Sequence, residues 1–433
     1  MPAGVDRIGV HGFSRQPPRS PSPALQRITL TYGAPDPLVL EGLEGAELIA
    51  FEPPRGATGD AARAMTSAAV AAPVRSPPLA AHVVPGDRVV VALCGDVPEA
   101  AAIVTAVAEC LASAGVAPAD VHVIQGPPLG PAAGGTAAEV PAPAGCTPFD
   151  PALEVSTSYL AADEAGRPLY LARALVDADV VVSVGEWGWN AALGGRSLEG
   201  ELWPTFSRTA CRRDLQVALA RRGRNALPEW KSGMHEIAWQ LGVCASLRVV
   251  RGAEGTLAAV FFGLPDDAGR QARAAAAAWS PRIPAPAAVA VCTLSDPAAG
   301  FGAITAAVAA AGRVTRPGGT ICVASSVAEP PGIIFGRWRQ GAPLDGLVHE
   351  AVASGDPTLV ADALQTRLFA RAIDDRRLVL LGELDEATVE ELEFGFAATP
   401  EVVERLAHRA DSVVVLPEAD RCFPQPGWAT VGE

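Results

Sequence analysis

A strand–helix–strand unit at residues 87–126 constrains the fold more than any other feature of this sequence. The segment DRVVVALCGD at 87–96 is an apolar run that ends at glycine and aspartate. An Ala-rich segment at 99–115 then has helical spacing, and VHVIQG at 121–126 is a second apolar run. A helical crossover returns the chain in the same direction, so the two strands pair in parallel. The sequence therefore predicts an α/β fold built on a parallel sheet.

The same alternation of strands and helices recurs and divides into two units. The segment SPRIPAPAA at 280–288 is rich in proline, which disfavours regular structure, and it marks a domain boundary. A new apolar run begins directly after it, at 289–297. We predict mainly parallel sheets in both units and a cleft between them. The predicted parts are a disordered tail at 1–24, a first α/β domain at 25–279 and a second at 289–433.

Composition argues against several classes of function. The formal net charge is −14, whereas nucleic-acid binding depends on clustered Lys and Arg, so we expect no nucleic-acid partner. No apolar run is long enough to span a membrane, and the start of the chain has no apolar signal region, so we expect a cytoplasmic protein. The eight cysteines lie far apart without a Cys-x-x-Cys pair, which predicts buried thiols and no zinc site.

Lysine is nearly absent, because Lys231 is the single lysine among 34 basic residues. Any reaction that needs a lysine amine therefore has to use it. His235 lies one helical turn later, and the two side chains could share a face as a compensating site. A lone histidine on a helix is more often structural. The six tryptophans between 187 and 279 either stack on a ligand or pack the domain interface.

Polar residues follow four predicted strands, and ligands of open α/β sheets bind beyond such strand ends. They are Asp96, Gln125-Gly126, Glu186 with Asn190, and Ser295-Asp296. Asp96, Glu186 and Asn190 are the catalytic candidates. The simpler interpretation of Asp96 and Asp296 is that they cap the following helices. The Pro/Gly/Ala-rich segment at 127–151 is a long loop, typical of a lid or an insertion.

Four segments, in this order, resemble the nickel-pincer lactate racemase family and its uncharacterised relatives. They are VVVALCGDVPEAAAIV at 89–104, ADVVVSVGEWGWNAALGGRS at 178–197, GMHEIAWQLGVCASLRVVRGAEG at 233–255 and AGRVTRPGGTICVAS at 311–325. The resemblance extends over most of the chain from about residue 27. It implies two α/β domains with an interdomain cleft, and it implies a racemase, hence an isomerase, that uses a nickel pincer nucleotide.

The residues that carry the chemistry of that family are replaced in this chain. Glu99 stands where the family's Asp-x-Thr-Arg-Pro signature has arginine, and Gly126-Pro127-Pro128 replaces Gly-x-His. The second catalytic histidine corresponds to Asn190, whose amide cannot accept and return a proton near neutral pH. Ser197 takes the place of the lysine that carries the cofactor.

The metal and second-domain positions of the family are also replaced. The nickel-ligating histidine falls near 214–216, where this chain has none, and the Tyr-Gln and Lys contacts fall near 300–308, which offers none of those residue types. We therefore expect neither the nickel pincer nucleotide nor another metal.

These features support three hypotheses. The first is a diverged, non-racemising protein that binds a small acid or nucleotide-like ligand in the interdomain cleft. Its ligand-binding candidates are Asp96, Glu99, Gly194, Gly195, Arg196, Ser197 and Asp296. The alternative is an isomerase of the same superfamily, acting on a 2-hydroxy acid or related substrate with a relocated carboxylate acid/base set. The carboxylates available for it are Asp96, Glu99, Glu186, Glu199 and Glu201. The third is a scaffold in a larger complex.

Overall fold

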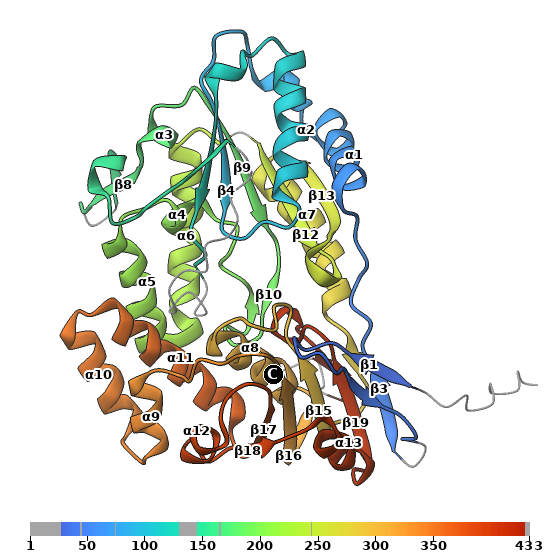
Figure 1. Ribbon diagram of the computed structural model, residues 1–433. Coiled ribbons are helices and arrows are strands. Elements are labelled where there is room, and N and C mark those ends of the chain that lie inside the picture. Colours follow the sequence, from blue (N-terminus) through green and yellow to red (C-terminus); the bar gives the residue numbers. More distant parts are fainter. Residues whose placement is uncertain are drawn as a thin grey trace, which may run out of the picture.

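The computed structural model describes residues 27–43, 46–73, 75–129, 145–163, 166–243 and 245–428. Within these ranges the chain forms two α/β units, each built on a six-stranded sheet (Figure 1). The predicted tail at 1–24 lies outside the described residues, as does the stretch 130–144 of the predicted long loop.

The first sheet has the strand order β13-β12-β9-β4-β5-β6. Its neighbouring strands are parallel except for β12 and β13, which form an antiparallel hairpin. All six residues of β4 are buried, as in a valine-rich strand covered on both faces. The strands are β4 (Val89–Cys94), β5 (Val121–Gly126), β6 (Cys146–Pro148), β9 (Val180–Glu186), β12 (Ser246–Arg251) and β13 (Leu257–Gly263).

Alternate residues of β4 pack against two different layers. Val91 and Leu93 join a cluster with helices α1 and α2. Val90 and Ala92 join another with α4, α6 and the β7–β8 hairpin. Helix α7 covers β12 and β13. The bounds of these elements are α1 (Gly59–Ala71), α2 (Ala100–Ser113), β7 (Thr157–Ala162), β8 (Pro168–Ala172), α3 (Arg173–Val176), α4 (Leu202–Thr205), α5 (Thr209–Arg222), α6 (Leu227–Gln240) and α7 (Pro265–Ala276).

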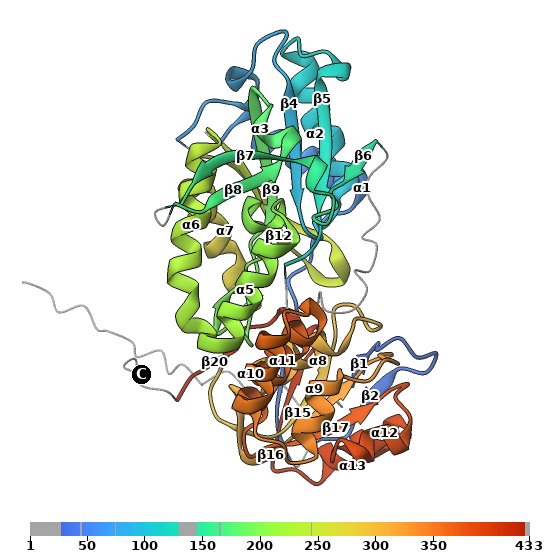
Figure 2. The ribbon, with the colours of Figure 1, turned by 90° about the vertical axis from the view of Figure 1, so that its left-hand side faces the viewer.

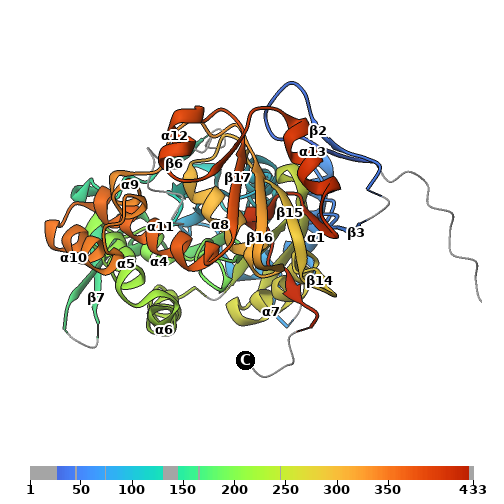
Figure 3. The ribbon, with the colours of Figure 1, turned by 90° about the horizontal axis from the view of Figure 1, so that it is seen from below.

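The second sheet is parallel throughout, in the order β18-β17-β16-β15-β19-β3. Its strands are β3 (Glu47–Ala50), β15 (Ala287–Thr293), β16 (Thr315–Ala324), β17 (Arg377–Leu381), β18 (Gly395–Ala397) and β19 (Ser412–Leu416). Figure 3 shows the sheet from below, with helices on both sides. The helices are α8 (Phe301–Gly312), α9 (Ile333–Arg339), α10 (Leu344–Ser354), α11 (Pro357–Ile373), α12 (Glu386–Glu391) and α13 (Pro400–His408).

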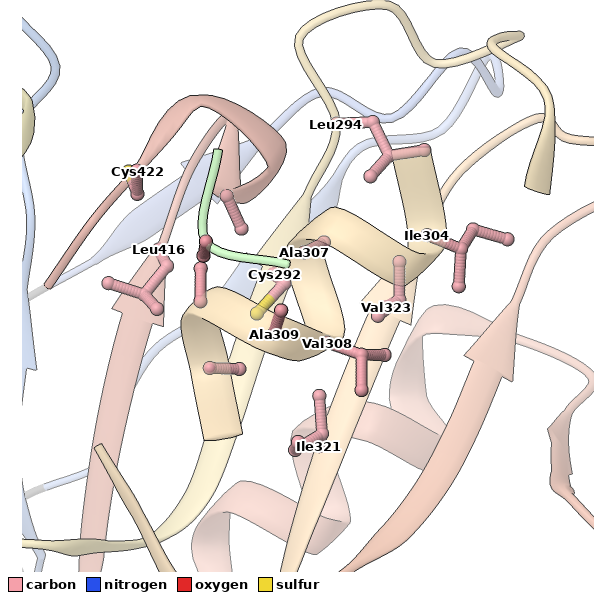
Figure 4. Packing of buried hydrophobic residues seen from close by; sticks show 14 of the residues in the cluster. Cys292, Leu294, Ile304, Ala307, Val308, Ala309, Ile321, Val323, Leu416 and Cys422 are labelled. Atoms are coloured by element: carbon pink, nitrogen blue, oxygen red, sulfur yellow. The ribbon is translucent and has the colours of Figure 1, made fainter. Parts of the chain in front are cut away.

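Helix α8 is the centre of the second core. Its residues are buried from Phe301 to Ala311, and its one buried polar side chain, Thr305, donates to the backbone oxygen of Phe301. Figure 4 shows Ile304 and Val308 of this helix beside Ile321 and Val323 of β16. Small side chains bring the helix close to the sheet, so the second unit is a rigid base for the loops at its strand ends.

The N-terminal strands belong to the second unit and not to the first, which corrects the predicted domain at 25–279. β3 pairs in parallel with β19 at the edge of the second sheet. The hairpin of β1 (Ile28–Leu30) and β2 (Leu38–Leu40) packs against the same sheet. An apolar run predicts a strand but not its sheet, because the pairing partner of β3 lies more than 350 residues away in the chain.

The two units are joined by a polar network at their strand ends and by an apolar contact beside it. Leu193 and Leu198 of the first unit share a cluster with Ile334 and Leu364 of the second. Helix α5 packs on α11 there, and Figure 2 shows the two helices one above the other. In the predicted boundary segment, β14 (Arg282–Ile283) pairs with β20 (Gln425–Pro426).

Two general properties concern the described part of the chain. None of its helices is both long enough and apolar enough to cross a membrane. Its cysteines are free thiols, with Cys244 outside the described residues. Burial raises the pKa of Cys146 and of Cys211 to about 11, so these thiols stay protonated at neutral pH.

Candidate functional site

Three strands of the first sheet end at one ionic cluster. Arg251 at the end of β12 donates from Nε to Oε2 of Glu186 at 3.0 Å. Its terminal nitrogen donates to the backbone oxygen of Asp96 at 2.8 Å and to the Asp96 carboxylate at 2.9 Å. The side chain of Glu186 is only 6% exposed, so a charge that is costly to bury is compensated directly. The predicted strand-end residues Asp96 and Glu186 therefore share one guanidinium.

The second domain supplies the other half of this cluster from the loop after β19. Arg421, in the short helix η8 (Ala419–Arg421), lies 3.8 Å from the Glu186 carboxylate. Its Nε donates to the hydroxyl of Ser295 at 3.2 Å, and that hydroxyl donates to Asp420 at 2.5 Å. Burial opposes the charge on Arg421, but the Glu186 and Asp420 carboxylates raise its pKa above the usual range. Glu186 is thus bound by guanidinium groups from both domains.

Little space remains inside the ionic cluster. The cavity between Glu186, Arg251 and Arg421 has a volume of about 10 Å³, with three tryptophan side chains among its other walls. Such a volume holds roughly one water molecule. A ligand can bind at this point only by displacing an ion pair. The cluster therefore links the two domains and leaves no room for a ligand.

Glu418 is a titratable residue at the interface that the sequence does not reveal. Its Oε1 accepts a hydrogen bond of 2.8 Å from the backbone nitrogen of Glu254 in the first domain. Its Oε2 is buried and has no hydrogen-bond partner among the described residues. Burial raises the pKa of Glu418 to about 7. In the sequence, Glu418 follows a strand and Pro417, and no local pattern predicts that it is buried. Its burial depends on the other domain.

The loop after β9 forms a second site next to the interface. Its short hairpin pairs β10 (Trp189–Asn190) with β11 (Gly195–Arg196), and Figure 1 shows β10 at the junction of the two units. The Oδ1 of Asn190 accepts from the backbone nitrogen of Leu193 at 3.1 Å. The Ser197 hydroxyl accepts from the backbone nitrogen of Glu199 at 3.1 Å. Both polar side chains therefore hold the turn itself.

Arg196 belongs to a buried cluster that extends from this turn. Its guanidinium contacts one oxygen of Glu201, and Arg248 of β12 contacts the other at 3.2 Å. Burial disfavours the charge of Glu201, but Arg248 and Arg196 outweigh that effect and hold its pKa below the usual value. Glu201 is therefore ionised and unsuited to act as a base near neutral pH.

Positive charge exceeds negative charge in this turn cluster, which comprises Arg196, Arg248, Lys231 and Glu201. Burial lowers the pKa of Lys231, and the neighbouring Arg196 lowers it further. Three cationic groups thus face one carboxylate. In addition, the Nε atoms of Arg196 and Arg248 are buried without a hydrogen-bond partner among the described residues. A buried surplus of N–H donors and positive charge is suited to an anion.

Other predicted site residues lie apart from both clusters. Glu99 accepts from the backbone nitrogen of Gly59 at 2.8 Å, at the start of α1. Asp296 is exposed and accepts from the backbone nitrogen of Ala298 at 3.0 Å.

The predicted capping roles of Asp96 and Asp296 are wrong. The N-cap residue of α2 is Glu99, whose side chain makes no capping hydrogen bond, and that of α8 is Gly300, which has no side chain to cap with. The aspartates instead bind an arginine and a local turn.

Lys231 and His235 do not form a joint site. Lys231 belongs to the turn cluster, whereas the exposed His235 ring is 4.0 Å from Asp266 of α7. The tryptophans also divide: Trp187, Trp189 and Trp279 line the interface cavity, and the indole of Trp239 is 78% exposed.

Comparison with solved structures identifies the architecture. The lactate racemase apoprotein from Thermoanaerobacterium thermosaccharolyticum matches with a TM-score of 0.67 and 13% sequence identity, over 92% of this chain and 100% of that chain. The chain has a lactate racemase-like fold. A protein from Thermotoga maritima matches with a TM-score of 0.55 and 11% identity, over 85% of this chain and 98% of that chain. No family model matches the sequence, and no match is found among the curated proteins.

The turn positions that the sequence resemblance assigns to the nickel pincer nucleotide and its chemistry hold Ser197 and Asn190. Ser197 has no amine for the covalent link, and its hydroxyl is engaged in the turn. Asn190 supplies an amide in place of an imidazole. Within the described ranges, no group of three or more His, Cys, Asp and Glu side chains could hold a metal ion.

Proposed function

We propose that this protein is a diverged, non-racemising relative of the lactate racemases that binds a small anionic ligand between its domains. The turn cluster is the observation that carries the proposal, because Arg196, Arg248 and Lys231 face the single carboxylate of Glu201. The formal charge of the whole chain is −14, so a local surplus of two positive charges is not a consequence of composition.

The chemistry of the cluster favours a phosphate or carboxylate group. Arginine presents N–H donors in a planar fork that matches both anions, and a lysine amine adds a compact charge. Arg196 is the more accessible of the two arginines, with 29% of its side chain exposed against 10% for Arg248. The ligand's anionic group therefore approaches Arg196 and Lys231, while Arg248 holds Glu201 in place.

A nucleotide-like ligand also has an aromatic neighbour available. The guanidinium of Arg196 lies 5.7 Å from the ring centroid of Trp187, at the side of the turn that faces the domain interface. A ligand with an anionic group and a flat ring could bind the arginine and contact the indole edge. This arrangement supports a small acid or a nucleotide-like molecule.

The engagement of the predicted carboxylates Glu186 and Glu201 in ion pairs supports a binding role over racemisation. Proton transfer at a carbon next to a carboxylate needs a base within reach of that carbon. Glu186 is held by Arg251 and Arg421, and Glu201 by Arg248 and Arg196. Asn190 cannot serve as a base.

Isothermal titration calorimetry with inorganic phosphate, AMP and L-lactate tests this proposal. We expect saturable binding of at least one of them, weakened about tenfold or more by Arg196→Met and by Lys231→Met. Arg316→Met is the matched control, since this arginine lies in the second domain and pairs with Asp411. Equal affinities for all four proteins, or no binding of any probe, would refute the anion site.

A further inference from the structure

A large cavity in the described part of the chain has no role in the proposed function. Its volume is about 660 Å³, within the usual range for small-molecule sites. It lies between the β7–β8 hairpin and helices α5 and α6, which Figure 2 shows on the same side of the first domain. None of its lining residues belongs to the ionic cluster or to the turn cluster.

Aromatic rings form the walls of this cavity. Trp203 and Trp230 are stacked, with ring centroids 4.7 Å apart and planes 14° from parallel. Gly233 lines the cavity beside them, and a Cβ atom there would come within 3.1 Å of the Trp203 ring. Tyr170 is covered by the guanidinium of Arg208 at 3.6 Å from its ring centroid. The cavity thus offers flat apolar surfaces and already places one cation on an aromatic face.

Acidic side chains outnumber basic ones around the cavity. Four carboxylates line it, against two guanidinium groups: Asp163, Asp214, Glu229 and Glu236, and Arg167 and Arg208. Asp163 binds Arg167 at 2.7 Å, and Glu229 binds Arg222 at 2.7 Å. The carboxylate of Asp214 lies 3.5 Å from Arg213. Glu236 accepts a hydrogen bond of 3.0 Å from the neutral amide of Gln240, which leaves its charge uncompensated by that contact.

The thiol of Cys211 also lines the cavity. Burial raises the pKa of Cys211, so it contributes a neutral and weakly polar surface. An anionic ligand would meet the excess of carboxylates and find no free guanidinium pair, because Arg167 is bound to Asp163 and Arg208 contacts Tyr170 and Thr157. A cation would meet Glu236 and Asp214 at the rim and an indole surface beneath.

We propose that this cavity binds a small organic cation whose flat apolar body contacts Trp230 and Trp203 and whose ammonium group is held by Glu236 and Asp214. Aromatic walls combined with carboxylates are the features by which proteins bind such cations. The site is independent of the anion site, since it shares no lining residue with it.

Calorimetric titration with two probes that have the same ring and opposite charges tests this inference. Tryptamine carries an ammonium group on an indole ring, and indole-3-acetate carries a carboxylate on the same ring. We expect saturable binding of tryptamine with a stoichiometry near one, and an affinity for indole-3-acetate that is about tenfold or more lower. Equal binding of the two probes, or no binding of tryptamine, would overturn the proposal.

Variants locate the binding. Glu236→Gln should weaken tryptamine binding several-fold and leave indole-3-acetate unweakened. Ala210→Trp places a large ring in the cavity from an exposed helix position and should abolish binding. Ala274→Trp, at an exposed position of α7 outside the cavity, is the matched control. Retained tryptamine binding in Ala210→Trp would contradict the assignment.

The two sites can be distinguished in the same set of proteins. Arg196→Met should weaken phosphate binding without changing tryptamine binding, and Ala210→Trp should do the reverse. Loss of both ligands in either variant, with the far-ultraviolet circular dichroism unchanged, would contradict the independence of the cavity.

Discussion

Replacing Glu418 by glutamine should stabilise the protein at alkaline pH and leave its stability unchanged at acidic pH. Burial raises the pKa of Glu418 from 4.5 to about 7. The pKa of Glu418 is higher in the folded protein than in the unfolded chain. The protonated carboxyl therefore contributes to the free energy of unfolding in full below about pH 4.5, and this contribution is lost as the pH rises through 7. The ionised carboxylate is thus a cost of folding at pH 8, and the amide of Glu418→Gln does not carry that cost.

The magnitude follows from the size of the pKa shift. About 2.5 units correspond to roughly 3 kcal/mol at 1.36 kcal/mol per unit, and partial solvent screening reduces this to about 2 kcal/mol. We therefore expect Glu418→Gln to raise the free energy of unfolding by about 2 kcal/mol at pH 8. At pH 4 the two proteins should be equally stable, because the wild-type carboxyl is then protonated.

Chemical denaturation followed by tryptophan fluorescence, at pH values from 4 to 8, measures this difference. Glu254→Gln is the matched control, since the exposed Glu254 side chain loses its charge while its backbone nitrogen still donates to Glu418. The control should retain the wild-type pH dependence. A difference between Glu418→Gln and wild type that does not change with pH, or a less stable variant at pH 8, would refute the titration of Glu418.

Three further predictions concern the two clusters and the interface. Arg251→Met should lower the free energy of unfolding by about 3 kcal/mol, because Glu186 stays buried without its main partner; adding Glu186→Gln should recover part of the loss in chemical denaturation. Glu201→Gln should cost about 2 kcal/mol at pH 7, and this cost should shrink as the pH falls below about 4.5, since the pKa of Glu201 is depressed. Trp189→Ala should cost about 3 kcal/mol and lower the melting temperature, because it removes the ring stacked 5.1 Å from Phe423 across the interface. Unchanged stability in any of these variants would contradict the corresponding contact.

The elements with strong local patterns were predictable from the sequence. β4 and β9 are buried valine-rich runs, and α8 is an apolar helix with a single polar side chain, so each carries its own signal. Helices α9, α10 and α11 lie in a region for which we predict no element from the sequence, since two of them are only 7 and 11 residues long. The sheet to which β3 belongs depends on a distant partner, which no local pattern encodes.

The position of the candidate site was predictable from the sequence, but the arginines that pair with its carboxylates were not predicted. Strand-end reasoning located Asp96 and Glu186, and both lie in the ionic cluster. It missed Arg251 and Arg421, although Arg251 is a basic residue at the end of an apolar strand and therefore a readable signal; Arg421 lies in a loop five residues after its strand and gives no such signal. Arg251 lies 65 positions from Glu186 and 155 positions from Asp96 in the sequence, and only the fold brings these residues together.

The replaced residues Asn190 and Ser197 make racemisation the most direct test of our central proposal. The chain would be produced together with the enzymes that make the nickel pincer nucleotide, and the optical rotation of an L-lactate solution and the nickel content of the purified protein would be measured. We predict a constant rotation and no stoichiometric nickel. A decay of the rotation to zero, with about one nickel per chain, would contradict the proposal that this lactate racemase-like protein does not racemise lactate.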